Sequence, residues 1–366
     1  MERRLARGHV ESDADARRDP RTGPGPGGDR AVIASTTVPL PSLAELLGPA
    51  LPRVLADCRP HTGVPLVTKR VSGGNVAHVF SVRGPADRVI IKIRREHFAR
   101  IPSLRADPAL IGDERRLLEL YHAAAPGVFP RVLAFHDDTR AMVLSDVFPD
   151  GRTYHQHLIE RSATAAEVAR LGRTLRRVHQ ATRDARAPQR QNLDSRFPAY
   201  QRDFALRSLG HPVLDAACAE MAGRSERQLV LGDLAPKNIS ITDAQIGLCD
   251  LDNAHHGWPL YDLGYFAGHL LIHHLTRPHE LPALVTALLM GYQGKRTLRR
   301  QDAVLAATVA AGVVLYRLGD GIVPYSLGQP AALADRYRGR TRTLLDHGTL
   351  TLQDLVRAAQ PGTVPA

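Results

Sequence analysis

The chain has 366 residues, 43% of them hydrophobic, and a formal net charge of +11. This length is enough to bury one large or two moderate cores. The three cysteines show no metal-ligand spacing and form an odd set, which indicates neither a zinc site nor a disulfide framework. We therefore expect a reducing, cytoplasmic compartment.

The positive charge raises the possibility of nucleic-acid binding. Almost all of the basic residues are arginines scattered along predicted helices, and aromatic residues make up only 5% of the chain. Nucleic-acid sites usually show a clustered basic face, and those for single strands add stacking aromatics. We expect no nucleic-acid partner, although the charge is compatible with an anionic ligand such as a nucleotide.

The N-terminal part contains a tail, a helix and a β-rich block. Residues 1–36 lack hydrophobic periodicity and the layout of a secretory signal, so we predict a disordered tail. Residues 41–58 predict an amphipathic helix interrupted near Pro52. Strands are then predicted at 66–72, 76–83, 87–96, 130–136 and 140–147, with a helix over 107–124 that has Asp107 and Pro108 at its start.

After about Val147 the pattern becomes mainly helical. Helices are predicted at 164–182, 212–224, 261–275, 280–293, 298–318 and 331–347, with short β-segments near 229 and 246. The apolar run Ala303–Tyr316 is shorter than the about 20 residues that span a bilayer. We therefore predict a buried core helix and no membrane partner. The sequence predicts an α+β fold with an N-terminal part (37–147), a helical C-terminal part (148–366) and a cleft between them.

The stretch "LVLGDLAPKNISI" (Leu229–Ile241) places three polar residues in a short loop between β-segments. Asp233 and Asn238 are five apart, the spacing of the catalytic-loop Asp and metal-binding Asn of kinase-type phosphoryl transfer, and Asp250 follows twelve residues later. Asp233 could accept a hydroxyl proton while Asn238 and Asp250 hold Mg²⁺. A turn stabilised by local hydrogen bonds is the alternative.

Lys92 is an amine inside an apolar strand-like run. It could be an edge-strand lysine in solvent, or it could pair with Glu114 and bind α- and β-phosphates. Asp113 and Glu119 are competing partners for Lys92, and Glu119 is expected at the surface. A turn formed by Gly73, Gly74 and Asn75 precedes the lysine, and its amides could cover phosphates, although it lacks a full G-x-G-x-x-G motif.

The order of these features, and the run 229–271 above all, resembles the aminoglycoside phosphotransferase-like family of small-molecule kinases. The resemblance covers roughly Pro41 to the C-terminus and leans toward the methylthioribose-kinase-like side. It implies a bilobal protein-kinase-like fold, with a five-stranded antiparallel sheet and helix in the N-lobe and a mainly helical C-lobe. It also implies ATP and Mg²⁺ as cofactors and a small-molecule acceptor.

The resemblance also implies roles for single residues: Asp233 as catalytic base, Asn238 and Asp250 as Mg²⁺ ligands, Lys92 and Glu114 as the phosphate-anchoring pair, and Ser145, Asp146 and Val147 as the hinge that meets adenine. Asp262 matches a family aspartate, for which a structural, helix-capping role is expected.

The catalytic loop departs from the family pattern at two positions. Leu231 replaces a histidine that usually precedes Gly-Asp, and Lys237 stands where many members have a small residue. Lys237 could neutralise charge on the transferred phosphoryl group, or it could be a solvent-facing amine.

The leading hypothesis is an ATP-dependent O-phosphotransferase that acts on a hydroxyl of a small molecule such as a sugar-like metabolite, amino alcohol or antibiotic. Basic residues outnumber acidic ones after Asp262, which favours a neutral or anionic acceptor. The alternative is a nucleotide-binding pseudokinase or regulatory module. Protein kinase activity is disfavoured because a helix begins about ten residues after Asp250.

His255 or His256 could line the pocket, and His269 and His273 are expected to be packing or helix-surface residues.

Overall fold

The computed structural model describes residues 40–71, 74–186, 203–225, 227–294, 297–320, 327–348 and 350–362. The chain divides into a unit of Met1–Ala34 and a unit of Ser35–Ala366, and all the described residues belong to the second. The predicted disordered tail lies outside the described residues.

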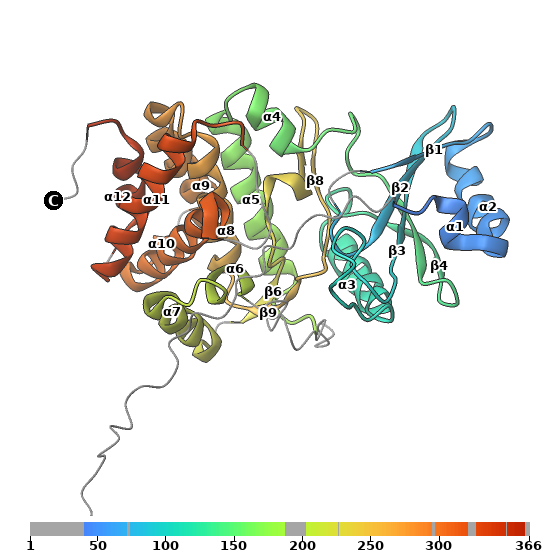
Figure 1. Ribbon diagram of the computed structural model, residues 1–366, viewed down its shortest axis with the longest axis horizontal. Coiled ribbons are helices and arrows are strands. Elements are labelled where there is room, and N and C mark those ends of the chain that lie inside the picture. Colours follow the sequence, from blue (N-terminus) through green and yellow to red (C-terminus); the bar gives the residue numbers. More distant parts are fainter. Residues whose placement is uncertain are drawn as a thin grey trace, which may run out of the picture. The chain divides into compact units, whose positions relative to one another are not determined.

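An antiparallel five-stranded sheet, in the order β1-β2-β3-β5-β4, forms the N-terminal part of the described chain (Figure 1). Its members are β1 (Val67–Arg70), β2 (His78–Arg83), β3 (Arg88–Ile93), β4 (Val132–His136) and β5 (Ala141–Ser145). Each strand lies inside a predicted run, so the predicted sheet is confirmed.

The alternation of side chains along β3 gives the sheet two different faces. Val89, Ile91 and Ile93 are buried against α1 (Leu43–Leu47) and α2 (Leu51–Thr62). Lys92 points to the opposite face, where α3 (Leu110–Ala124) packs. Because side chains alternate along the strand, the Lys92 amine lies on the α3 side of the sheet, opposite the apolar layer formed with α1 and α2.

The first predicted helix is interrupted at the 3₁₀ turn Gly48–Ala50, two residues before Pro52, so the predicted break near Pro52 is present. Pro52 itself lies in the first turn of α2, where a missing N–H costs nothing because no intrahelical acceptor is available there.

The C-terminal part is mainly helical, as predicted. Its helices are α4 (Tyr154–Glu160), α5 (Ala165–Ala181), α6 (Phe204–Arg207), α7 (Pro212–Gly223), α8 (Leu260–His273), α9 (Leu281–Gln293), α10 (Arg300–Leu315), α11 (Ala331–Asp346) and α12 (Leu352–Ala359). Helices α4, α6 and α12 were not predicted. The capping boxes that start α4 at Thr153 and α12 at Thr351 were available signals for two of them.

Helix α10 and the turn that follows it form a long apolar stretch. The stretch Arg300–Gly319 has 20 residues and is long and apolar enough to cross a membrane, so the prediction that this run is too short was wrong. However, 78% of its most apolar window is buried inside the protein. This burial confirms the predicted core helix, and the absence of a membrane partner stays a prediction.

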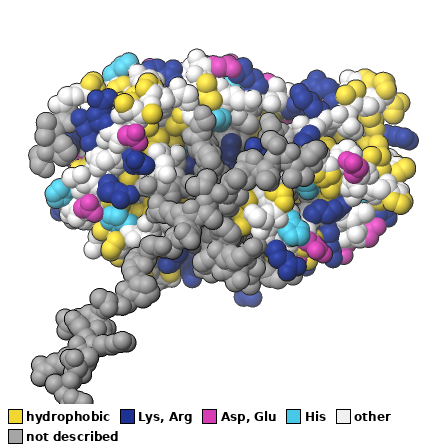
Figure 2. Space-filling model, in the orientation of Figure 1, with side chains coloured by type: hydrophobic (Ala, Val, Ile, Leu, Met, Phe, Trp, Pro, Cys, Tyr) yellow, Lys and Arg dark blue, Asp and Glu magenta, His cyan; other side chains and the backbone are white. Residues whose placement is uncertain are grey.

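The arginine-rich surface is not gathered into one patch on the face that Figure 2 shows. Lys and Arg side chains there are dispersed among hydrophobic and neutral groups. This dispersion agrees with the scattered arginines of the sequence, and the absence of a nucleic-acid partner stays a prediction.

Small residues allow the C-terminal helices to approach closely. A Cβ atom on Gly264 of α8 would lie 2.4 Å from the carbonyl oxygen of Ala306 in α10. One on Gly172 of α5 would lie 2.6 Å from the carbonyl oxygen of Leu288 in α9. Both helix pairs therefore depend on glycine at the contact, because backbone atoms cannot move aside as a flexible side chain can.

We expect Gly264→Ala to lower the free energy of unfolding by about 1–3 kcal/mol, because the added methyl overpacks the α8–α10 contact. Gly112→Ala in α3 is the matched control, since no atom lies within 4 Å of its added Cβ. The control should keep or raise stability by up to about 1 kcal/mol through helix propensity. Urea unfolding measures both, and equal stability of Gly264→Ala and wild type would contradict this account of the packing.

Candidate active site

A cavity of about 720 Å³ lies between the sheet and the helical part, within the range typical of small-molecule sites. The predicted cleft is therefore present. Every predicted site residue that the structure describes lines it, whereas Gly73 lies outside the described residues. The lining residues from the prediction are Gly74, Asn75, Lys92, Glu114, Ser145, Asp146, Val147, Asp233, Lys237, Asn238 and Asp250.

Lys92 pairs with the glutamate that the sequence favoured. Its Nζ lies 2.6 Å from Oε1 of Glu114 on α3, and both side chains are buried. The competitors have other partners, because Asp113 contacts Arg116 and the half-exposed Glu119 contacts Arg115. The solvent-facing alternative for Lys92 is thus wrong.

Lys92 also reaches the helical part of the chain. Its Nζ lies 3.1 Å from Oδ1 of Asp250 and 3.2 Å from Oδ1 of Asp252. Burial alone would lower the pKa of Lys92, but Asp252, Glu114 and Asp250 outweigh it and raise the pKa well above its ordinary value. The amine is therefore a fixed cation at neutral pH.

Asp252 and Arg94 were not predicted as site residues, but they belong to the same cluster. Arg94 is 1% exposed, and its Nη2 donates to Oδ1 of Asp252 at 2.5 Å. Burial would raise the pKa of Asp252, but Arg94 and Lys92 outweigh it and hold the pKa far below its usual range. Spacing was the available signal: Arg94 is two residues after Lys92 on one strand face, and Asp252 is two residues after Asp250.

The cluster of Lys92, Arg94, Glu114, Asp250 and Asp252 has one carboxylate more than it has cations. Burial and the negative charge of Asp252 raise the pKa of Glu114 to about 7. One further positive charge, from a proton or a metal ion, would balance the cluster.

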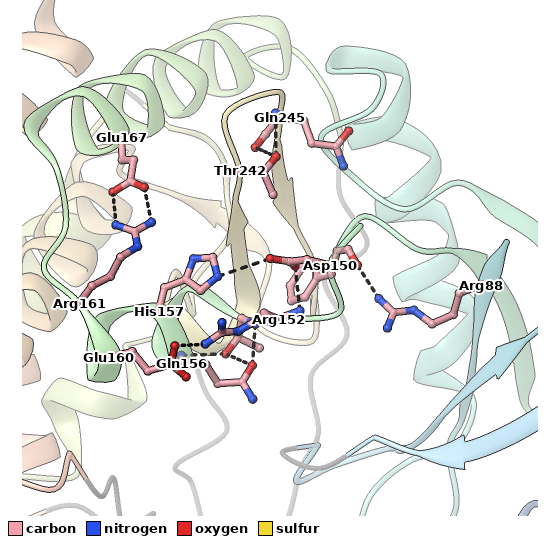
Figure 3. A network of polar contacts seen from close by, with 12 residues as sticks. Arg88, Asp150, Arg152, Gln156, His157, Glu160, Arg161, Glu167, Thr242 and Gln245 are labelled. Atoms are coloured by element: carbon pink, nitrogen blue, oxygen red, sulfur yellow. Dashed lines mark hydrogen bonds and ion pairs between the residues drawn. The ribbon is translucent and has the colours of Figure 1, made fainter.

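The predicted hinge follows β5 and is held by neighbouring elements. Oγ of Ser145 accepts a hydrogen bond from the backbone N–H of Arg131 at 2.8 Å. Arg88 of β3 binds the Asp146 carboxylate and the Phe148 carbonyl. In Figure 3, Arg88 reaches toward the connecting segment from the sheet side, while His157 of α4 contacts Asp150 from the other. The segment 146–150 therefore contacts both the sheet and the helical part of the chain.

The loop that carries Asp233 lies between two small two-stranded sheets. Strands β6 (Gln228–Val230) and β9 (His255–Gly257) form one pair, and β7 (Ile239–Ile241) and β8 (Ile246–Leu248) form the other. The backbone N–H of Cys249 donates to the Asn238 carbonyl at 3.0 Å. The hairpin β7–β8 therefore brings Asp250 beside Asn238 although twelve residues separate them.

Both oxygens of the Asp233 carboxylate are engaged. Oδ1 accepts from the Tyr265 hydroxyl at 2.8 Å and lies 3.6 Å from Nη2 of Arg317. Oδ2 lies 3.2 Å from Nζ of Lys237 and from Nδ2 of Asn238. Burial would raise the pKa of Asp233, but Lys237 and Arg317 outweigh it and lower the pKa. The carboxylate is therefore ionised at neutral pH.

Asp262 holds the loop in place. Its carboxylate accepts the backbone N–H groups of Leu231 at 2.7 Å and Gly232 at 2.9 Å, and it lies 3.0 Å from Nε2 of His179 in α5. The expected structural role fits these contacts, but the helix-capping part of that prediction was wrong, because the bonds go to the loop. The Leu231 side chain is buried, so the loop is held through its backbone and not through side chain 231.

Two residues of the site have left-handed backbone conformations. Gly232 has φ 77°, and a Cβ there would lie 2.3 Å from the Asn253 carbonyl oxygen, so this position needs glycine. Asp250 has φ 66°, a conformation that costs energy for a residue with a Cβ. The turn at Asp250 aims its carboxylate at Lys92.

Of the two histidines that could line the pocket, only His255 does so in the described structure. His255 lines the cavity, whereas His256 pairs with Leu229 in the β6–β9 ladder. The rings of His269 and His273 lie 6.4 Å apart on buried α8, and burial lowers the pKa of both well below the ordinary value. These two rings are therefore neutral packing groups at neutral pH.

A profile of the phosphotransferase enzyme family matches residues 67–301, which is more than half of the chain. The protein belongs to this family. A search of curated proteins finds no match.

Several solved structures resemble the chain, each with low sequence identity. Amicoumacin kinase hAmiN, in complex with AMP-PNP, Ca²⁺ and Ami, has a TM-score of 0.50 and 16% identity, with 82% of this chain and 94% of that chain covered. A choline/ethanolamine kinase family protein from Mesorhizobium loti has a TM-score of 0.47 and 18% identity, covering 85% and 99%. Spectinomycin phosphotransferase APH(9)-Ia, in complex with ADP and spectinomycin, has a TM-score of 0.48 and 13% identity, with 84% of this chain and 97% of that chain covered. The likeness to the amicoumacin kinase shows the bilobal kinase-like fold that the resemblance implied.

We expect Asp252→Asn to lower the free energy of unfolding by about 1–3 kcal/mol, because the buried Arg94 guanidinium would lose the ionised acceptor of its hydrogen bond. Asp335→Asn is the matched control, since its carboxylate is 62% exposed in an i,i+3 pair with Arg338. An exposed pair contributes about 0–1 kcal/mol. Chemical denaturation compares the two variants, and an equal small effect in both would show that the buried cluster does not stabilise the fold.

Proposed function

We propose that the protein is an ATP-dependent O-phosphotransferase that transfers the γ-phosphoryl group of ATP to a hydroxyl of a small molecule. The observation that carries this proposal is the meeting of Lys92, Glu114 and Asp250 across the cleft, beside the loop that holds Asp233. Kinase-type phosphoryl transfer needs this set: a lysine fixed by a glutamate, a metal-binding aspartate and a base. Family membership supports the same reaction class.

The donor atoms at the site fit Mg²⁺. Carboxylate oxygens of Glu114, Asp250 and Asp252 lie within 4.8 Å of one another, and Mg²⁺ prefers oxygen ligands. The Nδ2 of Asn238 donates to Asp233, which leaves its amide oxygen as the remaining ligand atom. We assign Asn238 and Asp250 as the residues that would hold the ion. When bound, Mg²⁺ neutralises charge on the β- and γ-phosphates.

The nucleotide would lie along the sheet side of the cavity. Lys92, kept cationic by three carboxylates, would bind the α- and β-phosphates. The turn with Gly74 and Asn75 would cover the phosphates with backbone amides. The backbone of Ser145, Asp146 and Val147 would meet adenine.

Asp233 would act on the acceptor hydroxyl. Its carboxylate is ionised and buried, so it can orient the hydroxyl and accept its proton as the new bond to phosphorus forms. Lys237 carries a pKa that burial would lower but that Asp233 and Asp250 raise, so it remains a cation beside both carboxylates. We propose that Lys237 neutralises charge on the phosphoryl group in transit.

The pseudokinase alternative draws its support from Leu231 and the incomplete glycine motif. The contacts of Asp262 weaken the first argument, because the loop is tied through its backbone. A module that only binds nucleotide also has no physical need for a buried, ionised Asp233 between two cations. We therefore favour the enzyme. The free cysteines Cys58, Cys218 and Cys249 support the reducing, cytoplasmic setting.

Asp233→Asn should lower kcat by about 10²–10⁴-fold, because the amide cannot accept the hydroxyl proton. Thermal stabilisation by Mg-ATP should persist in this variant, since the assigned nucleotide contacts are elsewhere. ADP release with a panel of hydroxylated acceptors measures the effect, with Asp335→Asn as the control. If wild type binds Mg-ATP but no acceptor speeds ADP release above the Asp233→Asn rate, the pseudokinase reading stands.

Asp250→Asn should weaken the metal-dependent part of nucleotide binding. Wild type should be stabilised against heat by Mg-ATP more than by ATP with EDTA, and the variant should lose most of that difference. The measurement is the shift in Tm at fixed nucleotide concentration. An unchanged difference in Asp250→Asn would remove Asp250 from the metal site.

A further inference from the structure

Two cations flank the Asp233 carboxylate, one on each oxygen. Lys237 lies 3.2 Å from Oδ2, and Arg317 lies 3.6 Å from Oδ1. The inference drawn from this arrangement rests on the proposed function, in which the acceptor hydroxyl approaches Asp233. Any acceptor that does so must place its neighbouring groups within a few ångströms of both positive charges.

Arg317 is a charge in an unusual place. It follows the apolar, buried helix α10, in the π-helical turn Tyr316–Asp320, and is 8% exposed. π-Helical turns are rare and frequently occur at functional sites. Its Nη2 donates to the Tyr265 hydroxyl at 3.1 Å, and its guanidinium carbon lies 5.0 Å from the centre of the Tyr316 ring. The chain therefore buries a guanidinium at the wall of the cavity, beside the proposed base.

The two cations face different parts of the reaction. Lys237 is adjacent to Asn238, and its charge interacts with Asp250, which places it toward the metal and the phosphoryl group. Arg317 lies on the other oxygen of Asp233, toward Tyr265 of α8. In the proposed function the phosphoryl group lies on the Lys237 side of Asp233, so the acceptor would approach the base from the Arg317 side.

Further hydrogen-bond donors line the same cavity. His155 and Gln156 belong to α4, which contacts the turn that carries Lys237. Among the described residues that line the cavity, most other carboxylates belong to α3, to the hinge or to the Lys92 cluster. The exception is Asp203, whose charge acts on Tyr261. Apart from the base itself, the cavity wall around Lys237 and Arg317 thus offers positive charge and donors more than negative charge.

We propose that the acceptor is an anion: a hydroxylated small molecule with a carboxylate or phosphate a few bonds from the accepting hydroxyl, which Arg317 binds through its guanidinium. In the reaction, the bond between the γ-phosphorus and the β–γ bridging oxygen breaks, and ADP leaves with that electron pair. The acceptor oxygen forms the new bond to phosphorus, and its proton goes to Asp233. An acceptor with an ammonium group near the hydroxyl would be repelled by Arg317 and Lys237 and is disfavoured.

The experiment measures ADP release by the full chain with Mg-ATP and acceptors of three charges. Glycerate and gluconate provide a carboxylate, and glucose 6-phosphate provides a phosphate. Glucose and myo-inositol are neutral, and choline and kanamycin are cationic. We expect the anions to give the highest kcat/KM, and the carboxylate and phosphate arms show which anion the site takes.

Variants at Arg317 test its role. Arg317→Gln should raise the KM for the preferred anion by at least about 30-fold, the lower end for removing one partner of a buried charge pair. The KM for ATP should change by less than about twofold. Arg317→Lys, which keeps the charge, should retain the preference for anions over neutral acceptors. Arg336→Gln, at an exposed arginine of α11, is the matched control and should behave as wild type.

The outcomes separate the two proposals. Faster turnover of choline, kanamycin or neutral sugars than of the anions would overturn the anionic acceptor and leave the phosphotransferase proposal standing. An increase in the KM for ATP with an unchanged acceptor KM in Arg317→Gln would place Arg317 on the phosphoryl group and overturn its assigned role. Absence of both Mg-ATP stabilisation and ADP release with every acceptor would instead refute the proposed function. The wild-type panel needs no variant, so a folding defect in Arg317→Gln leaves the charge preference testable.

Discussion

The arrangement of the site depends on one buried ion cluster. Lys92 enters it from β3 and Arg94 from the residue after that strand, and Glu114 enters from α3. Asp250 and Asp252 come from a loop 158 residues further along the chain than Lys92 and Arg94, respectively. A buried lysine without counter-ions would lose its proton or unfold the region, because desolvation opposes the charge. The carboxylates reverse that tendency, so the same contacts keep the amine charged and hold the sheet against the helical part. The contacts proposed to bind the nucleotide and the contacts that hold the two parts together are therefore the same interactions.

The loop around Asp233 illustrates a second constraint. Its position is set by backbone contacts to Asp262 on α8, and α8 is buried along its whole length. The loop is therefore held by a fully buried helix of the core, and the departure at Leu231 leaves these contacts in place. The same helix supplies Tyr265, which binds the Asp233 carboxylate. One core helix thus aligns the loop and orients the proposed base.

Local sequence patterns correctly predicted the features that depend only on residues close together in the chain. Alternation predicted the strands, 3.6-residue periodicity predicted the long helices, and the D-x4-N spacing with a later aspartate selected Asp233, Asn238 and Asp250. Prediction failed where the partner was distant. Arg94 and Asp252 meet across 158 residues, and Arg317 reaches Asp233 from the end of an apolar helix. Short helices such as α4 and α6 were missed because a few residues carry too little periodicity to be read.

By itself, the sequence determined the α+β class, the order of elements and the choice of residues that meet in the candidate site. These follow from propensity, periodicity and short-range spacing, which act within a few residues along the chain. Only the tertiary structure decided between Glu114 and its neighbours as the partner of Lys92, gave Asp262 its role on the loop, and set Arg317 beside the proposed base. Those outcomes depend on which buried charges face one another, because in a low-dielectric interior each charge must find its counter-ion in space, whatever its position in the chain.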